Sequence, residues 1–396
     1  MKRGLKIIHA IYYNTLYFFL SILIRFYFRQ WQIANYKNIP HKGPVIFAAN
    51  HQNAFLDALV ILFSQPRNVY YLVRANIFEN PTARFWLESL RMLPIYRVRD
   101  GLRSVAKNDE IIDRCVRILS RGRAPLTIFA EGNHNLRRSL RPLQKGIARI
   151  AFATMEANNF ELDLAVVPIG LNYGRHTRFR SDMFVYYGDP IYVKDYVSLY
   201  KENPNKAYTQ LISDLEAKLD EIVLSIHPSK YYEQIENEWL NKRTPKHDLL
   251  EQFNNDKQLV KEISKKYTQE PVEVPEEAKQ EPVPALPSML YRILMFPVFI
   301  YGYVNSYLSY YLLHLLIKNV VSDIHFYGSV KKASNLILAP LVFFIQALVL
   351  YFITGNGAIA AIYFISLPFA GILAFDYKYA VFDKLPRMKG VASYKI

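Results

Sequence analysis

The chain has 396 residues and a single cysteine, Cys115. One cysteine excludes an internal disulfide framework and any zinc cluster built on cysteine ligands. No Gly-x-Gly-x-x-Gly or Walker loop and no Gly-x-Ser-x-Gly turn occurs, and no two of the nine histidines stand three or four residues apart. We therefore predict no nicotinamide, no ATP, no metal ion and no serine nucleophile of the hydrolase type.

Apolar and basic residues are plentiful. Hydrophobic residues make up 51% of the chain, with 30 Tyr and 25 Phe, so most of the chain can bury enough apolar surface to offset the entropy lost on ordering. The 49 Lys and Arg exceed the 34 Asp and Glu, which gives a formal net charge of +15. Such a charge favours anionic partners. No recognised nucleic-acid motif accompanies it, so we expect anionic lipids and substrates rather than nucleic acid.

The longest uncharged stretch, Ala333 to Phe375, contains no Asp, Glu, Lys, Arg or His. Two passes of about 20 apolar residues would each span a bilayer, and Thr354-Gly355-Asn356-Gly357 stands where a turn between them is needed. We predict two transmembrane helices; a buried helical hairpin of a soluble protein is the alternative. Lysines and an arginine flank the stretch on both sides, which predicts that both flanks are cytoplasmic.

Two further apolar segments are candidates for contact with a membrane. Met289 to Ile317 contains Pro297 and Gly302, and we expect a kinked re-entrant or interfacial helix there, with a single span as the alternative. Ile7 to Phe28 has basic residues on both sides and no small-residue cleavage site after it, so residues 1–29 are predicted to be a retained membrane-anchoring helix. It can lie in one leaflet or span the bilayer.

The remaining boundaries follow from composition. Residues 270–288 hold five Glu and five Pro and predict an extended linker. It separates a C-terminal membrane module with a basic tail, residues 289–396, from a polar helical segment, residues 230–269. Residues 30–229 alternate short apolar runs with helical patterns, for example Val45 to Ala49 before a helix and Leu126 to Ala130 after one. This alternation predicts an α/β domain with a largely parallel central sheet flanked by helices.

Polar residues follow two of the predicted strands at the edge where open α/β sheets hold their ligands. The first group is Asn50-His51, with Asp57 six positions after the histidine. A histidine oriented by a carboxylate can act as a general base, although such a pair is more often a hydrogen-bonding feature. The second group is Glu131-Gly132, where glycine allows close approach to a ligand and the carboxylate can hold a hydroxyl; an ordinary turn is the alternative.

Basic residues stand near both groups. Arg97 and Arg99 would share one face of an extended segment and can bind a phosphate, unless they are ordinary surface arginines. Between Arg97 and Arg149 there are 13 Lys and Arg against five acidic residues. This cluster is expected to bind an acyl donor or an anionic membrane surface, and a solvated helix is the alternative. Its residues next to the Glu-Gly turn are Arg137, Arg138, Arg141 and Lys145.

The order of these blocks, followed by Val166-Val167-Pro168-Ile169, resembles the glycerolipid acyltransferase family over roughly residues 37–192. Members acylate glycerol 3-phosphate or lysophosphatidic acid. The resemblance implies that His51 is the catalytic base and Asp57 its orienting carboxylate. It also implies a substrate phosphate- and glycerol-binding set, to which we assign Asn50, Arg97, Arg99, Glu131, Gly132 and His134.

Two features depart from the family pattern. Five residues rather than four separate His51 from Asp57, and Asn133-His134-Asn135 replaces the common Thr-Arg-Ser. Both variants are similar to the branch that contains fungal glycerol-3-phosphate and dihydroxyacetone-phosphate acyltransferases, which slightly favours a first-step acceptor.

The resemblance implies a membrane-bound enzyme of phospholipid synthesis that transfers a fatty acyl group from acyl-CoA or acyl-ACP, with no cofactor beyond that co-substrate. We expect it on the cytoplasmic side of a membrane, which is the inner or plasma membrane if the source is bacterial. Another lipid acceptor, such as a lysophospholipid or an aminolipid, is one alternative. A catalytically inactive lipid-binding scaffold, suggested by the altered His51–Asp57 spacing, is the other. The sequence leaves the oligomeric state open.

Overall fold

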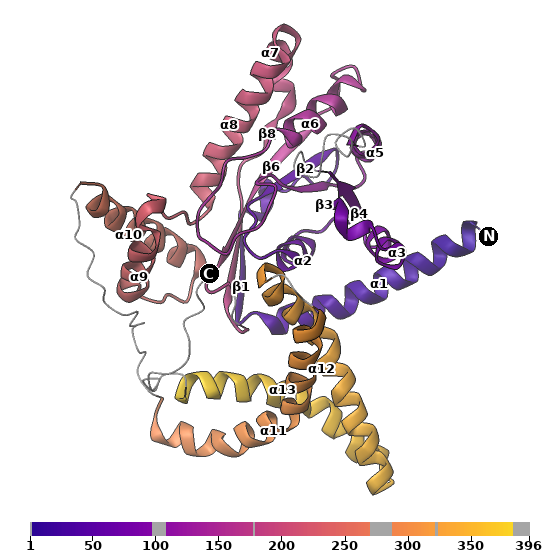
Figure 1. Cartoon of the computed structure of the whole chain (residues 1–396), viewed down its shortest axis with the longest axis vertical. Helices are drawn as coiled ribbons and strands as arrows, with labels where there is room; N and C mark the ends of the chain where they lie inside the picture. Colours follow the sequence, from indigo (N-terminus) through magenta and orange to yellow (C-terminus); the bar gives the residue numbers. More distant parts are fainter. Residues whose placement is uncertain (1, 97–107, 177–178, 270–286, 321–323, 383–396) are drawn as a thin grey trace. The chain divides into compact units, whose positions relative to one another are not determined.

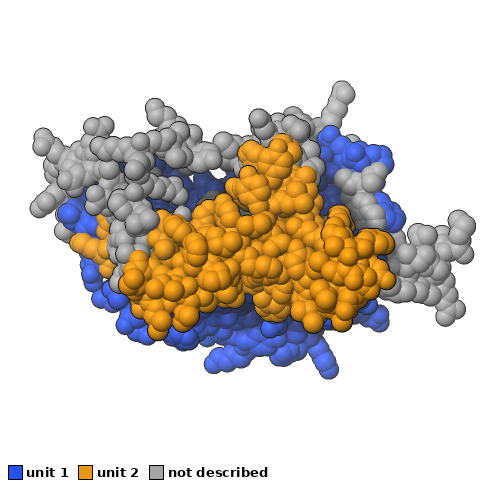
Figure 2. All heavy atoms as spheres, turned by 90° about the horizontal axis from the view of Figure 1, so that it is seen from below, with its two compact units in different colours: residues 1–239, 243–273 blue, residues 240–242, 274–396 orange. Residues whose placement is uncertain are grey.

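The computed structural model describes residues 2–96, 108–176, 179–269, 287–320 and 324–382. The chain divides into two compact units, which Figure 2 shows in different colours. The first comprises residues 1–239 and 243–273, and the second comprises residues 240–242 and 274–396. Each unit is described below by itself. The domain boundaries expected from composition stay predictions.

The first unit is built on one sheet. Its described strands are β1 (Gln30–Ala34), β2 (Val45–Ala49), β3 (Tyr70–Arg74), β4 (Met92–Ile95), β5 (Leu126–Phe129), β6 (Ala165–Tyr173), β7 (Asp182–Tyr187) and β8 (Ile191–Tyr192). They run in the order β1-β7-β6-β2-β5-β3-β4, with β8 beside β6 (Figure 1). All neighbouring pairs are parallel except β6 with β7 and β6 with β8. The predicted α/β architecture with a mostly parallel sheet is confirmed.

Helices occupy most of the remaining chain of this unit (Figure 1). They are α1 (Lys2–Tyr27), α2 (Phe55–Ser64), α3 (Pro81–Ser89), α5 (Asn108–Ser120), α6 (Gly146–Glu156), α7 (Val197–Glu202), α8 (Pro204–Ile222), α9 (Tyr232–Lys242) and α10 (Leu249–Gln269). The last three residues of α9 are the ones assigned to the second unit. Short 3-10 helices lie at Tyr36–Asn38, Ala75–Phe78, Val193–Tyr196 and Ser229–Tyr231. Local signals explain some ends: α8 begins where the Asn203 side chain accepts the Lys206 N–H and Pro204 occupies the first turn.

Side chains of the central strands alternate between two hydrophobic cores. All five residues of β2 are buried; Ile46 and Ala48 belong to one core, and Val45, Phe47 and Ala49 to the other. The first core is completed by α5, α6 and α8, and the second by α1 and α2. Because side chains alternate along a strand, helices must cover both faces of the sheet. A sheet covered in this way leaves its strand ends as the place for a polar site.

The register of the central strands brings two loops together. Ala49, the last residue of β2, pairs with Phe129 of β5 and with Ile169 of β6. Since these three strands are parallel, their carboxyl ends meet at one edge of the sheet. His51 and Glu131 each follow the paired residues by two positions, so they leave the sheet at the same level.

The second unit contains three long helices, α11 (Met289–Val320), α12 (Ile324–Thr354) and α13 (Gly357–Val381). The turn between α12 and α13 lies within the segment predicted for it. Gly355 has a positive φ of 64°, and the Asn356 side chain accepts the N–H groups of Ala358 and Ile359. Met289 to Ile317 forms part of one continuous helix with Pro297 inside it. Whether this helix is re-entrant, interfacial or spanning stays a prediction.

Among the described residues, only α13 is long and apolar enough to cross a membrane, with a mean hydropathy of 2.2 in its most apolar window. Leu338–Thr354 of α12 is a shorter apolar helix. The expected pair of transmembrane helices is thus supported by length and composition for one helix. Membrane anchoring by residues 1–29 stays a prediction.

Candidate active site

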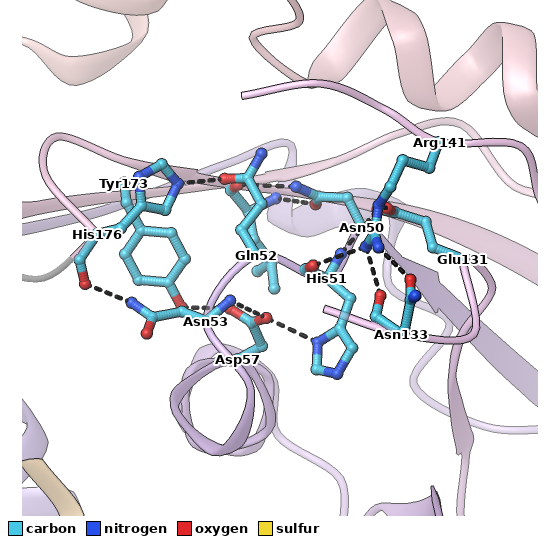
Figure 3. Close-up of polar contacts among 11 residues, drawn as sticks. Asn50, His51, Gln52, Asn53, Asp57, Glu131, Asn133, Arg141, Tyr173 and His176 are labelled. Atoms are coloured by element: carbon cyan, nitrogen blue, oxygen red, sulfur yellow. Dashed lines mark hydrogen bonds and ion pairs between the residues drawn. The ribbon is translucent and has the colours of Figure 1, made fainter. Parts of the chain in front are cut away.

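His51 and Asp57 form a hydrogen-bonded pair at the carboxyl edge of the sheet (Figure 3). His51 follows β2, and Asp57 stands in the first turn of α2. His51 Nδ1 lies 2.8 Å from Asp57 Oδ2, and Asp57 is completely buried. A carboxylate only accepts hydrogen bonds, so this contact places the imidazole proton on Nδ1 and leaves Nε2 as the basic nitrogen.

The loop before α2 accommodates the extra residue between the two side chains. Ala54 has a φ of 44°, an unusual value for a residue with a side chain, and α2 begins at the next position. The Leu56 N–H donates to the Asn53 carbonyl across this turn at 3.0 Å. The chain therefore reverses sharply and returns Asp57 to His51 despite the five-residue spacing.

Aromatic rings surround the imidazole. The ring of Phe129 stacks on that of His51, with centroids 4.0 Å apart and planes inclined by 15°. The His134 ring lies edge-on, with its centroid 5.6 Å from that of His51. The His51 side chain is 15% exposed, so the ring is held by its neighbours and still reaches solvent. A general base needs both properties, because it must be oriented and must meet its substrate.

Glu131 and Arg141 hold the backbone of His51. Glu131 Oε1 accepts the His51 N–H at 2.9 Å, and Glu131 Oε2 accepts from Arg141 Nε at 2.5 Å. Arg141 also donates to the His51 carbonyl at 3.1 Å, as does the Asn135 N–H at 3.1 Å. Further short bonds join Arg141 to the side chain and carbonyl of Asn133. Both peptide groups of His51 are thereby fixed by the loop that follows β5.

Burial changes the acid–base behaviour of Glu131. Desolvation raises the pKa of Glu131 above its ordinary value, and the Arg141 guanidinium and the His51 N–H oppose that rise. The side chain is 1% exposed. Glu131 is therefore occupied by contacts within the protein.

Tyr173, which the sequence analysis did not single out, completes the surroundings of Asp57. Its hydroxyl donates to Asp57 Oδ1 at 2.5 Å, while the Asn53 N–H donates to Oδ2 at 2.7 Å. Burial and the neighbouring Asp57 carboxylate raise the pKa of Tyr173 well above its ordinary value. No spacing signal could have revealed this residue, since it stands 116 positions from Asp57.

A second group of hydrogen bonds ties the histidine loop to β6 and the chain after it (Figure 3). The Asn50 amide both donates to and accepts from the backbone of Leu171, at 3.1 and 2.7 Å. Gln52 Oε1 lies 2.8 Å from His176 Nε2, and the Asn53 side chain donates to the His176 carbonyl at 2.7 Å. These bonds anchor the loop on one side of His51, as Arg141 does on the other.

The remaining residues predicted to bind the substrate, Arg97, Arg99, Asn50 and Gly132, do not share one environment. Arg97 and Arg99 lie outside the described residues. Asn50 is buried, with its amide engaged by the β6 backbone. Gly132 has a positive φ of 75°, which favours glycine, and a Cβ there would meet Gln144 Cγ at 3.2 Å. Of the whole predicted set, Glu131 and His134 contact His51, whereas Asn50 only precedes it in the chain and Gly132 follows Glu131.

The basic cluster divides into exposed and buried members. Arg137 lies over the Tyr232 ring with a half-exposed side chain, and the exposed Lys145 contacts Thr209. Arg138, which was expected to bind an acyl donor or an anionic surface with the rest of the cluster, is buried instead. It is 5% exposed and donates to the carbonyls of Tyr173 and Gly174 at 2.6 and 2.8 Å. The buried guanidinium charge is stabilised by the two carbonyls and by Glu236, which take the place of water.

Comparison with known proteins identifies relatives of this chain. Residues 30–172 match the family model described as Acyltransferase. An uncharacterized acyltransferase of Schizosaccharomyces pombe is 23% identical over 292 residues, which cover 52% of this chain and 43% of that protein. Glycerol-3-phosphate O-acyltransferase 2 of Saccharomyces cerevisiae is 20% identical over 315 residues, covering 54% and 42%.

Two further similarities are shorter or more distant. Glycerol-3-phosphate O-acyltransferase 1 of Saccharomyces cerevisiae is 32% identical over 101 residues, covering 25% of this chain and 13% of that protein. The chain thus matches less than half the length of these curated relatives. The crystal structure of the 1-acyl-sn-glycerophosphate acyltransferase PlsC from Thermotoga maritima has a TM-score of 0.37 and 15% identity, covering 54% of this chain and 81% of that one.

Proposed function

We propose that this chain is a glycerolipid acyltransferase, which moves a fatty acyl group from a thioester donor to a hydroxyl of glycerol 3-phosphate or lysophosphatidic acid. The match of residues 30–172 to the acyltransferase family model and the names of two relatives support this proposal. The donor is acyl-CoA or acyl-ACP. The names of the two Saccharomyces relatives favour glycerol 3-phosphate as the acceptor. The observation that carries the proposal is the 2.8 Å contact between His51 and the buried Asp57.

The proposed chemistry needs one general base. His51 Nε2 takes the proton of the acceptor hydroxyl while the oxygen attacks the thioester carbonyl, and Asp57 stabilises the imidazolium that forms. The tetrahedral intermediate collapses to an ester and a thiolate, and the His51 imidazolium returns its proton to the thiolate, which gives the free thiol and the neutral base. General-base assistance of this kind contributes typically 10²–10⁴-fold to the rate. No acyl-enzyme is required, since the thioester is already activated.

Charged residues have proposed roles in substrate binding. We assign the acceptor phosphate to Arg97 and Arg99 because paired guanidinium groups match phosphate geometry. The exposed side chains of Arg137 and Lys145 are proposed to bind the anionic donor or anionic lipid. Glu131 is proposed to act through the backbone of His51, which its contacts support.

The enzyme is proposed to work at a membrane surface, with the α/β domain in the cytoplasm. Exposed aromatic side chains on α1 support this location, since Phe18 and Phe19 are 59% and 56% exposed. Large rings left in water are unfavourable, whereas the interface of a bilayer accommodates them. The apolar helix α13 supports a membrane location independently.

The test is acceptor-dependent release of thiol by the purified full chain in detergent. Acyl-CoA and acyl-ACP are each offered with glycerol 3-phosphate, dihydroxyacetone phosphate or lysophosphatidic acid, and His51→Ala is assayed in parallel. We expect release with at least one pair and its loss in the variant. Lipid binding without turnover would instead identify the scaffold, and release that persists in His51→Ala would contradict the role of the base.

A further inference from the structure

The residue least explained by the proposed function is Tyr173, the last residue of β6. It is 2% exposed, and its hydroxyl donates to Asp57 Oδ1 at 2.5 Å. Asp57 Oδ2 receives the other two donors, the Asn53 N–H and His51 Nδ1. Each oxygen of the carboxylate is therefore engaged, and the group cannot rotate without breaking hydrogen bonds in a buried site.

Tyr173 is itself held in place from behind. Its carbonyl accepts from Arg138 Nη1 at 2.6 Å, and the adjacent Gly174 carbonyl accepts from Arg138 Nη2 at 2.8 Å. The Arg138 guanidinium lies 4.9 Å from the centre of the Trp239 ring and 3.6 Å from Glu236 Oε1, both on α9. Continuous contacts thus run from α9 through Arg138 and Tyr173 to Asp57.

We propose that Tyr173 is a positioning residue of acyl transfer, whose hydroxyl fixes Asp57 Oδ2 against His51 Nδ1 and shares the negative charge of the carboxylate. This inference rests on the proposed function. Tyr173 moves no proton in the reaction, because its raised pKa keeps the hydroxyl a donor. Through its contacts with Arg138, the polar helix α9 supports the end of β6, which carries Tyr173.

The charge sharing has a consequence for pH dependence. Without the hydroxyl, the Asp57 carboxylate bears more charge and stabilises protonated His51 more strongly. Protonated His51 cannot act as a base, so activity should be lost at a higher pH as the solution is acidified.

Other groups near the pair also influence that limb. Within the described part of the chain, Glu131 and Arg141 contact the His51 backbone, and the His134 ring lies 5.6 Å from that of His51. The His176 ring lies 5.4 Å from that of Tyr173. All four are identical in the wild type and in a Tyr173 variant, so a comparison of the two isolates the hydroxyl.

The test compares Tyr173→Phe with a matched control, Tyr187→Phe. Tyr187 is also buried in the sheet, and its hydroxyl bonds Ser64 Oγ at 2.7 Å, away from the dyad. For Tyr173→Phe we expect kcat to fall about tenfold with an unchanged acceptor KM, and the acidic limb of kcat/KM to move up by about one pH unit. Tyr187→Phe should leave both unchanged.

A second substitution retains the hydroxyl and should shift the acidic limb of the activity profile in the opposite direction. Incorporation of 3-fluorotyrosine at position 173 makes the phenol more acidic and its hydrogen bond to Asp57 stronger. The acidic limb should then move to lower pH. This substitution also covers the case in which Tyr173→Phe does not fold, which thermal unfolding detects.

Failure of this inference is distinguishable from failure of the proposed function. If the wild type transfers no acyl group with any substrate pair, the proposed function is wrong. If the wild type is active while both Tyr173 substitutions keep its kcat and its pH profile, Tyr173 positions nothing. NMR of the full chain provides a readout independent of activity: the chemical shift of the His51 ring signal, assigned with His51→Ala, should change in Tyr173→Phe and stay the same in Tyr187→Phe, and an unchanged signal in Tyr173→Phe would overturn the inference.

Discussion

Removing the Arg141 side chain should destabilise the first unit and slow catalysis together. Arg141→Ala leaves the Glu131 carboxylate buried with the His51 N–H as its remaining donor among the contacts described above. It also removes a donor from the His51 carbonyl. The loop that carries His51 then loses one of the two donors to the His51 carbonyl, although Arg141 lies 90 positions from His51.

The size of the effect follows from burial. Breaking a buried ion pair from one side costs about 3–5 kcal/mol. The side chains of Glu131 and Arg141 are 1% and 22% exposed, which places this pair at the lower end, about 3 kcal/mol. For a domain of this size the change corresponds to a fall in Tm of roughly 6–12 °C. Displacement of His51 by about 1 Å should lower kcat by about 10²-fold.

The pH dependence of this destabilisation has a definite sign. Burial already raises the pKa of Glu131, and loss of Arg141 removes the main opposing charge, so the pKa in the folded variant rises further above its unfolded value. The folded variant then binds a proton more readily than the unfolded chain. The destabilisation is therefore full above the folded-state pKa and shrinks as the pH falls through it.

Thermal unfolding and kcat of the full chain in detergent provide the assay. The matched control is Arg137→Ala, because Arg137 is 48% exposed and its contact with Glu233 is 4.0 Å long. Exposed pairs contribute about 0–1 kcal/mol, so the control should change Tm by about 4 °C at most. The reasoning is refuted if Arg141→Ala has the same Tm as Arg137→Ala and retains the wild-type kcat.

Three other predictions test separate parts of the structure. Burial raises the pKa of the Cys115 thiol to about 12, so a thiol reagent at pH 8 should label it in urea but not in the native protein; rapid native labelling would contradict its burial. Ala54→Gly should raise Tm by about 2–4 °C by relieving a positive φ, and a fall would argue against that conformation. Gly302→Ala should lower thermal stability, because a Cβ there would lie 2.1 Å from the Ala370 carbonyl oxygen, whereas Gly357→Ala, with no such clash, serves as the control.

The central strands were predictable because their signal is local. Val45 to Ala49 is a short apolar run before a helical pattern, and it forms a strand with those bounds. The order of the strands is not a local property, since β2 pairs with β5 and β6 rather than with its neighbours in sequence. The sequence placed His51 and Asp57 together through a resemblance, and the turn at Ala54 explains how the altered spacing still allows contact.

The supporting residues of the site could not be predicted, because their roles depend on distant parts of the chain. Tyr173 ends an apolar strand, so the sequence predicts a residue of the hydrophobic core. Only the structure shows that its hydroxyl contacts Asp57. Arg138 stands in a run of basic residues that is typical of a solvated surface, yet the Trp239 ring and two carbonyls enclose it. Glu131 resembles a ligand-binding carboxylate, and only the position of Arg141 shows that both of its oxygens are occupied.

The most direct test of the central claim is a comparison of wild type and His51→Ala in single-turnover acyl transfer with glycerol 3-phosphate and acyl-CoA or acyl-ACP, after thermal unfolding has verified that the variant is folded. The account predicts formation of acylated glycerol phosphate by the wild type and a rate lower by about 10²–10⁴-fold in the variant. Equal rates in the two proteins would contradict the assignment of His51 as the base.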